Sequence, residues 1–494
     1  MRAPRRLYIP PFRDRVEGGA RPVITREQAL SLSHDIMSLT SAKIAIVQIS
    51  HTVKSVTQLA SNTVRGVEEG ERLQVSLRAE SVNPFAGLML FQTNQTDDKS
   101  LHELVQRVDS VTRDMVGWND QRMVHERDEQ DTYPATKLWY PSTVGALESA
   151  RETSVKPIVD TVRNARLDAS GFVGVMARSE AVLTESGISA FSEETDCEVN
   201  VTARPNDVTS TGWSGVATRD WSTVDPTRIA TDAAETARRA LRPSAVEPGR
   251  RTAILGPAAV VQLMRFFALH FDGGASDEGD TGFSKVRGQE RGSRFKERLF
   301  DPRITITTDP TDPEAGFRPW FWKGYVCNPI TWVADRTLKT LAYGVGSLLH
   351  GKAYADIPYG FRLHGGDTTV EAMIAQCDEG IYVNRFSGLE VSDWFSGMMT
   401  GVTRDGCFFI KHGKIDRPVK NFRFTTSPFF VLNNIIAMGP SHRAAFGFSP
   451  WTEVEKVRAH QDWFSEFYEW PRRPMVVPAL MVRDFNFSAL VDAV

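Results

Sequence analysis

Residues 405–419 of the chain read Asp405-Gly-Cys-Phe-Phe-Ile-Lys411, then His412-Gly413, then Lys414-Ile-Asp-Arg-Pro-Val419. A two-residue segment that contains glycine, with strand-forming runs on both sides, is typical of a β-hairpin. Further short strand patterns, interrupted by glycine and proline, surround this hairpin in the rest of the C-terminal half. We therefore predict a C-terminal, mostly antiparallel β domain over residues 244–494.

The N-terminal unit, residues 20–115, combines helix and strand patterns. Thr25 followed by Gln28 is a capping box, which predicts a helix over Arg26–Leu39. A second helix is predicted from Ser100 to Met115, because its apolar residues fall on one face. Apolar alternation and short apolar runs predict an antiparallel sheet between the helices, with strands over Ile44–Val53, Arg72–Ala79 and Phe85–Phe91. This unit is predicted to be an α+β domain.

Residues 116–243 are predicted to form a linker and a middle domain. The stretch 116–150 is polar and irregular, so we interpret it as a linker or an exposed crossing. Two helices are predicted after it, near Lys156–Asp168 and over Pro226–Leu241, and strands are predicted near Gly171–Ala177, Ala181–Ser186 and Glu198–Arg204. The predicted fold class of the whole chain is α+β.

Composition and charge exclude several classes of protein. Hydrophobic residues make up 41% and charged residues 24% of the 494 residues, which is typical of globular domains. The formal net charge of -3 gives no overall positive field, so we expect no nucleic-acid partner. No run approaches the ~20 apolar residues that cross a bilayer, so we expect no membrane association. The four cysteines form no C-x-x-C motif, and we expect a cytoplasmic protein.

Several stretches, in their order along the chain, resemble the TldD/PmbA family of metalloprotease-like proteins, also called modulators of DNA gyrase. The resemblance extends over nearly the whole chain and is most specific in the C-terminal unit. The stretches that carry it there are Thr400-Gly-Val-Thr-Arg404-Asp405-Gly406, His412-Gly413-Lys414-Ile415, Val419-Lys-Asn421-Phe422-Arg423-Phe424, Val477-Pro478-Ala479-Leu480 and Asp484-Phe-Asn-Phe487. The resemblance implies an α+β, TldD/PmbA-like fold and a dimer, with either a homologous TldD-like subunit or a second copy of this chain as partner.

The chain departs from the family at the catalytic motif. Family members of the TldD type are zinc peptidases with a His-Glu-x-x-x-His segment on a helix and a late cysteine. In the matching helix, Arg265 stands in place of the first His, Phe266 in place of the Glu, and only His270 remains. No cysteine follows Cys407. The chain is therefore more similar to the PmbA/TldE side of the family, and we expect no metal ligands and no cofactor.

Three functions remain open on this basis. The first is a non-catalytic TldE-like subunit that grips peptide for a partner metallopeptidase. The second is an enzyme with repurposed chemistry on a peptide-derived or other small metabolite, in which Arg265 holds an anionic group and His270 is the catalytic proton-transfer residue. The third is an active zinc peptidase, a hydrolase with unusual ligands. The sequence does not decide whether any reaction is catalysed.

Two side-chain environments have alternative interpretations. His270 could instead be a cationic residue at a helix end, with Gly273-Gly274 stopping the helix before a solvated acidic loop. The aromatic stretch from Phe317 to Trp332 could line a core, or it could build an interface or ligand groove. In the second case, Trp320 and Trp322 are the predicted substrate-binding residues together with Arg265.

Overall fold

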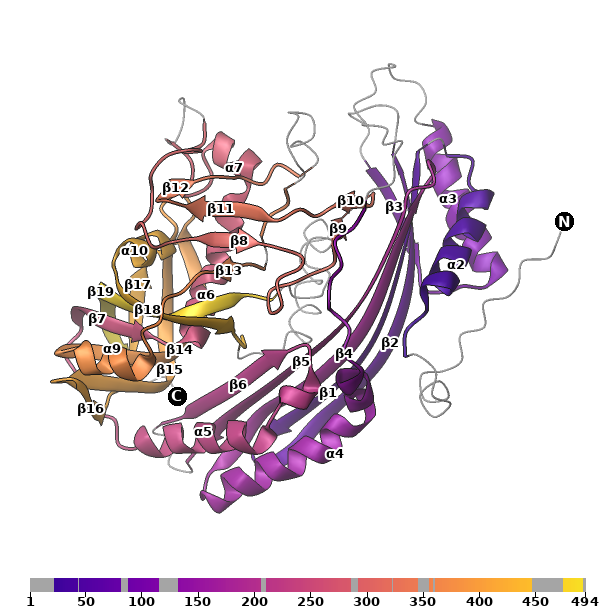
Figure 1. Ribbon diagram of the computed structural model, residues 1–494. Coiled ribbons are helices and arrows are strands. Elements are labelled where there is room, and N and C mark those ends of the chain that lie inside the picture. Colours follow the sequence, from indigo (N-terminus) through magenta and orange to yellow (C-terminus); the bar gives the residue numbers. More distant parts are fainter. Residues whose placement is uncertain are drawn as a thin grey trace.

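The computed structural model describes residues 22–42, 44–80, 88–114, 132–205, 210–285, 292–321, 323–344, 355–358, 360–446 and 474–491. Two large sheets dominate it, and each belongs to one half of the chain. Figure 1 shows a long, curved sheet with helices on its outer face and the C-terminal half of the chain on its inner side. None of the helices in these ranges is long and apolar enough to cross a membrane.

The N-terminal sheet has six antiparallel strands in the order β3-β2-β1-β4-β5-β6. Its strands are β1 (Ala45–Ala60), β2 (Thr63–Glu80), β3 (Leu88–Thr93), β4 (Asp168–Thr184), β5 (Ser189–Arg204) and β6 (Gly212–Thr218). Because β1 pairs with β4 from Ile46 and Thr184 to Leu59 and Gly171, one sheet joins the two units that the sequence analysis separated at residue 115. That separation was wrong. The two paired strands lie far apart in the sequence, so no local pattern indicates that they pair.

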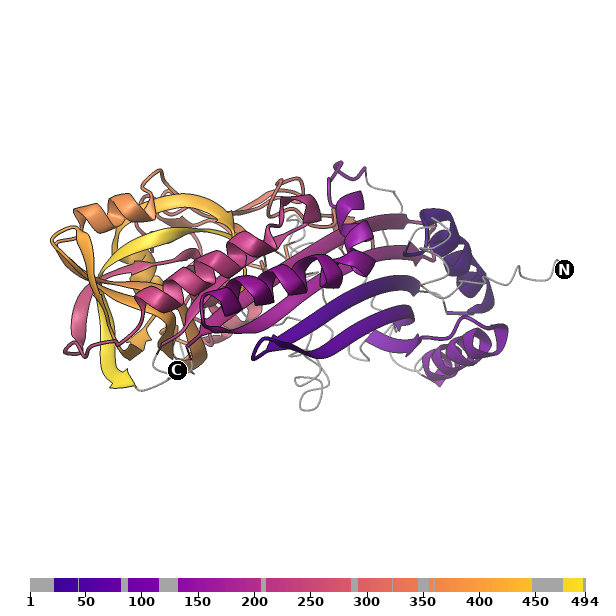
Figure 2. The same cartoon turned by 90° about the horizontal axis from the view of Figure 1, so that it is seen from below.

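The helices of this half cover one face of the sheet, as Figure 2 shows for α4 and α5. The helical elements are α2 (Arg26–Leu39), α3 (Asp98–Asp114), α4 (Pro141–Asn164), the short 3₁₀ element η1 (Trp221–Thr223) and α5 (Pro226–Arg239). The odd-numbered side chains Val173, Val175 and Ala177 of β4 pack under α4 and α5 because side chains alternate between the faces of a strand.

Several predicted elements of this half are confirmed and others are wrong. The helix over Arg26–Leu39 and its capping box are confirmed. The linker prediction for residues 116–150 is wrong from Pro141 onward, where α4 begins. The buried apolar face of α4 was not recognised in the sequence because the helix also contains Ser, Thr and Gly residues and an internal proline, Pro157. Two strands predicted around residue 180 are the single strand β4. Residues 85–87 of the predicted third strand lie outside the described residues.

The C-terminal sheet contains a closed ring of strands. Strand β7 pairs with β14 on one side and with β19 on the other, so the strands β7, β14, β15, β17 and β19 close on themselves. The strands of this half are β7 (Gly249–Leu255), β8 (Ile306–Thr308), β9 (Trp320–Phe321), β10 (Tyr325–Val326), β11 (Ile330–Ala334), β12 (Thr337–Leu338), β13 (Arg362–Leu363), β14 (Glu379–Asp393), β15 (Met398–Lys411), β16 (Lys414–Pro418), β17 (Asn421–Thr426), β18 (Ile435–Arg443) and β19 (Val476–Val491).

The predicted hairpin is confirmed as β15 and β16. His412 and Gly413 have φ values of 50° and 73°, the left-handed pair that a tight two-residue hairpin turn requires. The helical elements of this half are α6 (Pro257–Phe267), the 3₁₀ element η2 (Ala268–Phe271), α7 (Gly273–Glu278), α9 (Val370–Gln376) and α10 (Pro428–Asn433). The two glycines expected to stop the helix after His270 instead begin α7.

Candidate functional site

The N-terminal sheet turns a charged face toward the C-terminal domain. Opposite residues of paired strands share a face, so Arg178 of β4 lies beside Glu194 of β5, and Trp213 of β6 lies beside Thr202. We call this surface the inter-domain face; it comprises the even-numbered residues 172–182 and 190–200 with Trp213, Gly215, Ala217 and Arg219. The helices cover the opposite face, so these side chains are buried by other parts of the chain.

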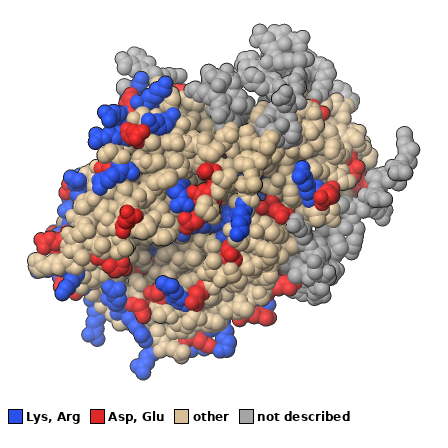
Figure 3. All heavy atoms as spheres, viewed as in Figure 1, with Lys and Arg blue, Asp and Glu red and all other residues tan. Residues whose placement is uncertain are grey.

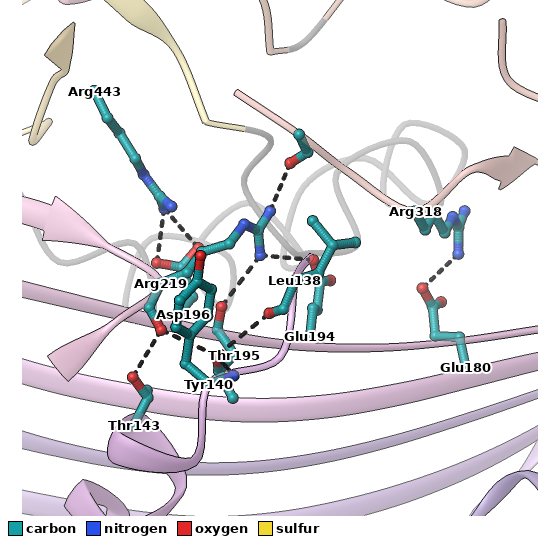
Figure 4. A network of polar contacts seen from close by, with 11 residues as sticks. Leu138, Tyr140, Thr143, Glu180, Glu194, Thr195, Asp196, Arg219, Arg318 and Arg443 are labelled. Atoms are coloured by element: carbon teal, nitrogen blue, oxygen red, sulfur yellow. Dashed lines mark hydrogen bonds and ion pairs between the residues drawn. The ribbon is translucent and has the colours of Figure 1, made fainter. Parts of the chain in front are cut away.

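Arginines from the C-terminal domain bind carboxylates on the inter-domain face (Figure 4). Arg443, at the end of β18, donates through one nitrogen to both carboxylate oxygens of Asp196, each at 2.7 Å. Arg318, just before β9, binds Glu180, which also accepts from Arg178 at 2.6 Å. These pairs hold the C-terminal domain against the sheet at two points.

A fourth arginine, Arg219 of the sheet, makes a further contact with the C-terminal domain. It donates to Glu194 at 3.1 Å and to the backbone oxygen of Gly316 in the C-terminal domain at 2.7 Å. The network therefore contains buried or nearly buried charges of both signs. On the face seen in Figure 3, acidic and basic side chains are likewise interspersed over the described surface.

The side-chain carboxyl of Glu180 is ionised at neutral pH. Burial raises the pKa of this carboxyl, but the guanidinium groups of Arg178 and Arg318 outweigh burial and hold the pKa below its ordinary value. Removing one member of such a buried pair leaves an uncompensated charge, which typically costs ~3–5 kcal/mol of stability. These buried ion pairs therefore help to fix the position of the C-terminal domain relative to the N-terminal sheet.

Helix α6, which carries the predicted site, touches the inter-domain face with its first turns. Ala258 packs with Trp213 and Ala217 of the sheet. Gln262, one turn later, donates to the backbone oxygen of Phe446 at 3.2 Å and accepts from the backbone N–H of Phe386 at 2.8 Å. The helix expected to carry all three motif positions is regular only to Phe267, and His270 lies in the tighter 3₁₀ element η2 that follows.

Arg265 and Phe266 occupy the last turn of α6. Both side chains are half-buried, and the guanidinium carbon of Arg265 lies 5.5 Å from the centroid of the Phe266 ring. Phe266 packs against the core of the C-terminal domain. A guanidinium is permanently charged and has no lone pair available for a metal, and a phenyl ring cannot act as a base.

His270 is a core residue. Its side chain is 1% exposed, and its Nδ1 accepts a hydrogen bond from the backbone N–H of Gly282 at 3.1 Å. The ring centroids of Phe429 and Trp394 lie 5.1 Å and 5.6 Å from that of His270. Burial lowers the pKa of His270 to about 4, so the imidazole is neutral at physiological pH. The alternative of a cationic His270 at a helix end is therefore wrong.

The residues at the family's motif do not fit zinc. His270 is the one imidazole of the three motif positions, and one of its nitrogens already accepts from Gly282. Structural and catalytic zinc sites use at least three protein ligands. In the ranges that the structure describes, no group of three or more His, Cys, Asp and Glu side chains could hold a metal ion.

Trp320 anchors the β9–β10 hairpin on the inter-domain face. The indole is 1% exposed and packs with Ile46, Val182 and Ala190 of the sheet, and the guanidinium of Arg318 lies 4.7 Å from its ring centroid. Trp322 lies outside the described residues. The predicted residues are therefore not assembled at one place, because Trp320 belongs to a cluster on the sheet and His270 to one in the C-terminal core.

Sequence reasoning missed the charged residues of the inter-domain face. Their signal is alternation: Glu194, Asp196 and Glu198 occupy every second position of β5, and the positions between and after them include the buried Cys197 and Val199. Such a pattern ordinarily indicates a solvated strand face. The distant arginines that bury these carboxylates could not be paired with them from the sequence.

Comparisons with known proteins define the class and then the family. Residues 248–489 match the family model described as the PmbA/TldA metallopeptidase C-terminal domain, so this half of the chain is metallopeptidase-related. The C-terminal half of the chain therefore belongs to the TldD/PmbA family, as the resemblance predicted. A comparison with curated protein sequences finds no match.

Solved structures share the fold over nearly the whole chain. A protein from Thermotoga maritima named as a modulator of DNA gyrase superposes with a TM-score of 0.73 at 12% identity, covering 92% of this chain and 99% of its own. A protein of the same description from Bacteroides thetaiotaomicron has a TM-score of 0.73 at 16% identity and covers 94% and 100%. TldE from Thermococcus kodakarensis has a TM-score of 0.73 at 14% identity and covers 92% and 99%. These likenesses establish the α+β, TldD/PmbA-like fold.

Proposed function

We propose that this chain is a non-catalytic, TldE-like subunit that grips peptide for a homologous metallopeptidase partner. One observation carries the proposal: the helix that would hold zinc presents Arg265, Phe266 and a buried, neutral His270. The structural likeness to a protein named TldE also supports the proposed subunit role. The proposal includes no metal and no cofactor in this chain.

A test of this proposal is reconstitution with a homologue that carries an intact His-Glu-x-x-x-His segment. The two chains should co-purify after co-expression, and light scattering at micromolar concentration should give the mass of a complex. Zinc-dependent hydrolysis of unfolded casein should require both chains. A partner that remains separate from this chain and is fully active alone would contradict the proposal.

The repurposed-enzyme alternative makes a different demand on His270. A general acid or base works best with a pKa near the operating pH, and burial keeps the pKa of His270 near 4. This favours the subunit proposal. The His270→Ala variant in the reconstituted complex distinguishes the subunit proposal from the repurposed-enzyme alternative, provided that thermal melting and turnover are measured on the same sample. A folded variant with unchanged turnover supports the subunit, whereas a rate loss on the order of 10²–10⁴-fold would support proton transfer by His270.

A further inference from the structure

Strand β2 has an outer edge that no neighbouring strand covers. Strand β1 pairs with β2 along its whole length, whereas β3 pairs with β2 only from Val75 to Glu80. In the part of the chain that the structure describes, no strand lies against the outer edge of residues 63–68. An edge of this kind leaves backbone N–H and C=O groups open to pairing with another strand.

Two valines on this edge are exposed. Val64 is 44% exposed and Val67 is 42% exposed. They lie opposite Leu59 and Thr57 of β1, and Leu59 belongs to the buried cluster under α4. In Figure 2 the hairpin of β1 and β2 lies beside α4, at the margin of the sheet. A strand added to this edge would continue the sheet and cover part of both valine side chains.

A glycine between the two valines points to the approach of another backbone. The φ angle of Gly66 lies outside the left-handed region, so the backbone conformation does not require glycine here. Packing does not require it either, because the nearest atom to an added Cβ is the side-chain oxygen of Gln58 at 3.9 Å. Glycine weakens a strand and commonly marks a position that another backbone or a ligand approaches closely.

The edge favours a short, uncharged stretch of extended chain over a second folded protein. Arg65 and Glu68 are the only charged side chains of residues 63–68, and Glu68 already pairs with Lys54. The register between β1 and β2 shifts near this edge, where β2 has one extra residue, and such a bulge limits long edge-to-edge pairing. Protein interfaces are generally built around aromatic and arginine anchors in a dry centre, whereas the apolar side chains here are two valines.

We propose that residues 63–68 of β2 bind a short extended peptide by β-augmentation, with the peptide backbone bonded to the outer edge of β2 and its side chains against Val64 and Val67. Six residues of strand offer one continuous line of about 20 Å. Main-chain bonds supply the affinity in this mode and tolerate many side chains, as an unfolded substrate demands. The inference rests on the proposed function and deepens it, because it names the surface with which the subunit grips peptide.

The first measurement separates backbone pairing from side-chain contact. The probe is a fluorescent heptapeptide of alternating Thr and Val with blocked ends, and its binding to the full chain is followed by anisotropy at low and high salt. Binding should be insensitive to salt. An analogue with N-methyl groups on two adjacent central residues loses a donor on each of its edges and should bind about tenfold more weakly. Equal binding of the two probes would overturn the inference, and this comparison uses the unaltered chain.

The second measurement locates the site. Val67→Asp should weaken binding of the first probe about fivefold, because the peptide then loses an apolar contact. Ile436→Asp is the matched control, since Ile436 of β18 is a strand residue with a similar exposure of 38%, and its affinity should be unchanged. The bound probe should also slow amide hydrogen exchange in residues 63–68 and leave the β15–β16 hairpin unchanged.

Two further outcomes would overturn the inference. One is protection from exchange that excludes residues 63–68. The other is a dimer in light scattering that binds no probe and becomes monomeric in Val67→Asp, because a second copy of the chain would then occupy the edge.

The inference and the proposed function can fail separately. An active complex with a metallopeptidase partner whose KM for casein is unaffected by Val67→Asp would remove this surface while leaving the subunit role intact. Binding of the first probe by a chain that forms no complex would retain the surface and remove the subunit role.

Discussion

Arg443 donates to both carboxylate oxygens of Asp196 at 2.7 Å, although 247 residues separate them in the chain. Both side chains are nine-tenths or more buried, so neither charge is solvated. The pair joins the end of β18 to β5 and thereby fixes the C-terminal domain on the inter-domain face. Charge-assisted bonds of this kind have stringent geometry, so the pair also sets the register between the two halves.

Removal of this pair should destabilise the protein strongly. Arg443→Met leaves Asp196 buried without its counter-ion, and the free energy of unfolding should fall by ~3–5 kcal/mol in urea titrations. Adding Asp196→Leu should recover much of this loss, because the uncompensated charge is then gone. Arg417→Met is the control, since its pair with Asp416 is exposed and should contribute less than ~1 kcal/mol. Equal effects of the two arginine variants would contradict the structural role of Arg443.

The burial of His270 should appear in the pH dependence of stability. Its pKa is near 4 in the folded protein against 6.5 ordinarily, so only the unfolded chain binds this proton between those values. The free energy of unfolding should therefore fall as pH drops from 6.5 to 4, by ~3 kcal/mol from this group. His270→Phe should remove that part of the slope, measured as the difference from the unaltered chain at each pH. His412→Gln, at an exposed histidine, should keep it, and an unchanged slope in His270→Phe would contradict a buried neutral imidazole.

The purified chain should bind no stoichiometric zinc. Arg265 and Phe266 supply no ligand, and His270 alone cannot provide the three protein ligands that zinc sites use. Elemental analysis after dialysis against buffer with one equivalent of zinc measures this, with an intact-motif homologue as the positive control. One equivalent of bound zinc that disappears in His270→Ala would contradict the prediction and restore the zinc-peptidase alternative.

Trp320 should behave as a core residue. Trp320→Ala removes an indole that is 1% exposed and packs on the sheet, and such truncations cost ~3–5 kcal/mol. Trp394→Ala truncates an indole that is 43% exposed and should cost much less. Chemical denaturation of both variants measures the difference, and a loss below ~1 kcal/mol for Trp320→Ala would show that the hairpin is not anchored by this residue.

Local features of the sequence predicted local structure well. The helix over Arg26–Leu39 follows from Thr25 and Gln28, whose side chains bond the backbone within the same turn. The hairpin at His412-Gly413 follows from the backbone angles that a two-residue turn demands. In both cases the interacting groups are a few residues apart, so the pattern and its physical cause are visible together. The helix and strand patterns predicted the α+β class, the family resemblance implied a TldD/PmbA-like fold, and the likeness to solved structures confirms both.

The candidate site could be predicted only in part. The sequence alone determined that Arg265, Phe266 and His270 stand at the motif positions, because this depends only on residue identity. Tertiary structure decided that His270 is neutral, since its pKa depends on burial among Phe429 and other rings from distant segments. It also decided that one sheet joins the first two units and that Asp196 meets Arg443. Strand pairing and charge burial bring together residues from distant parts of the chain, so no local periodicity encodes them.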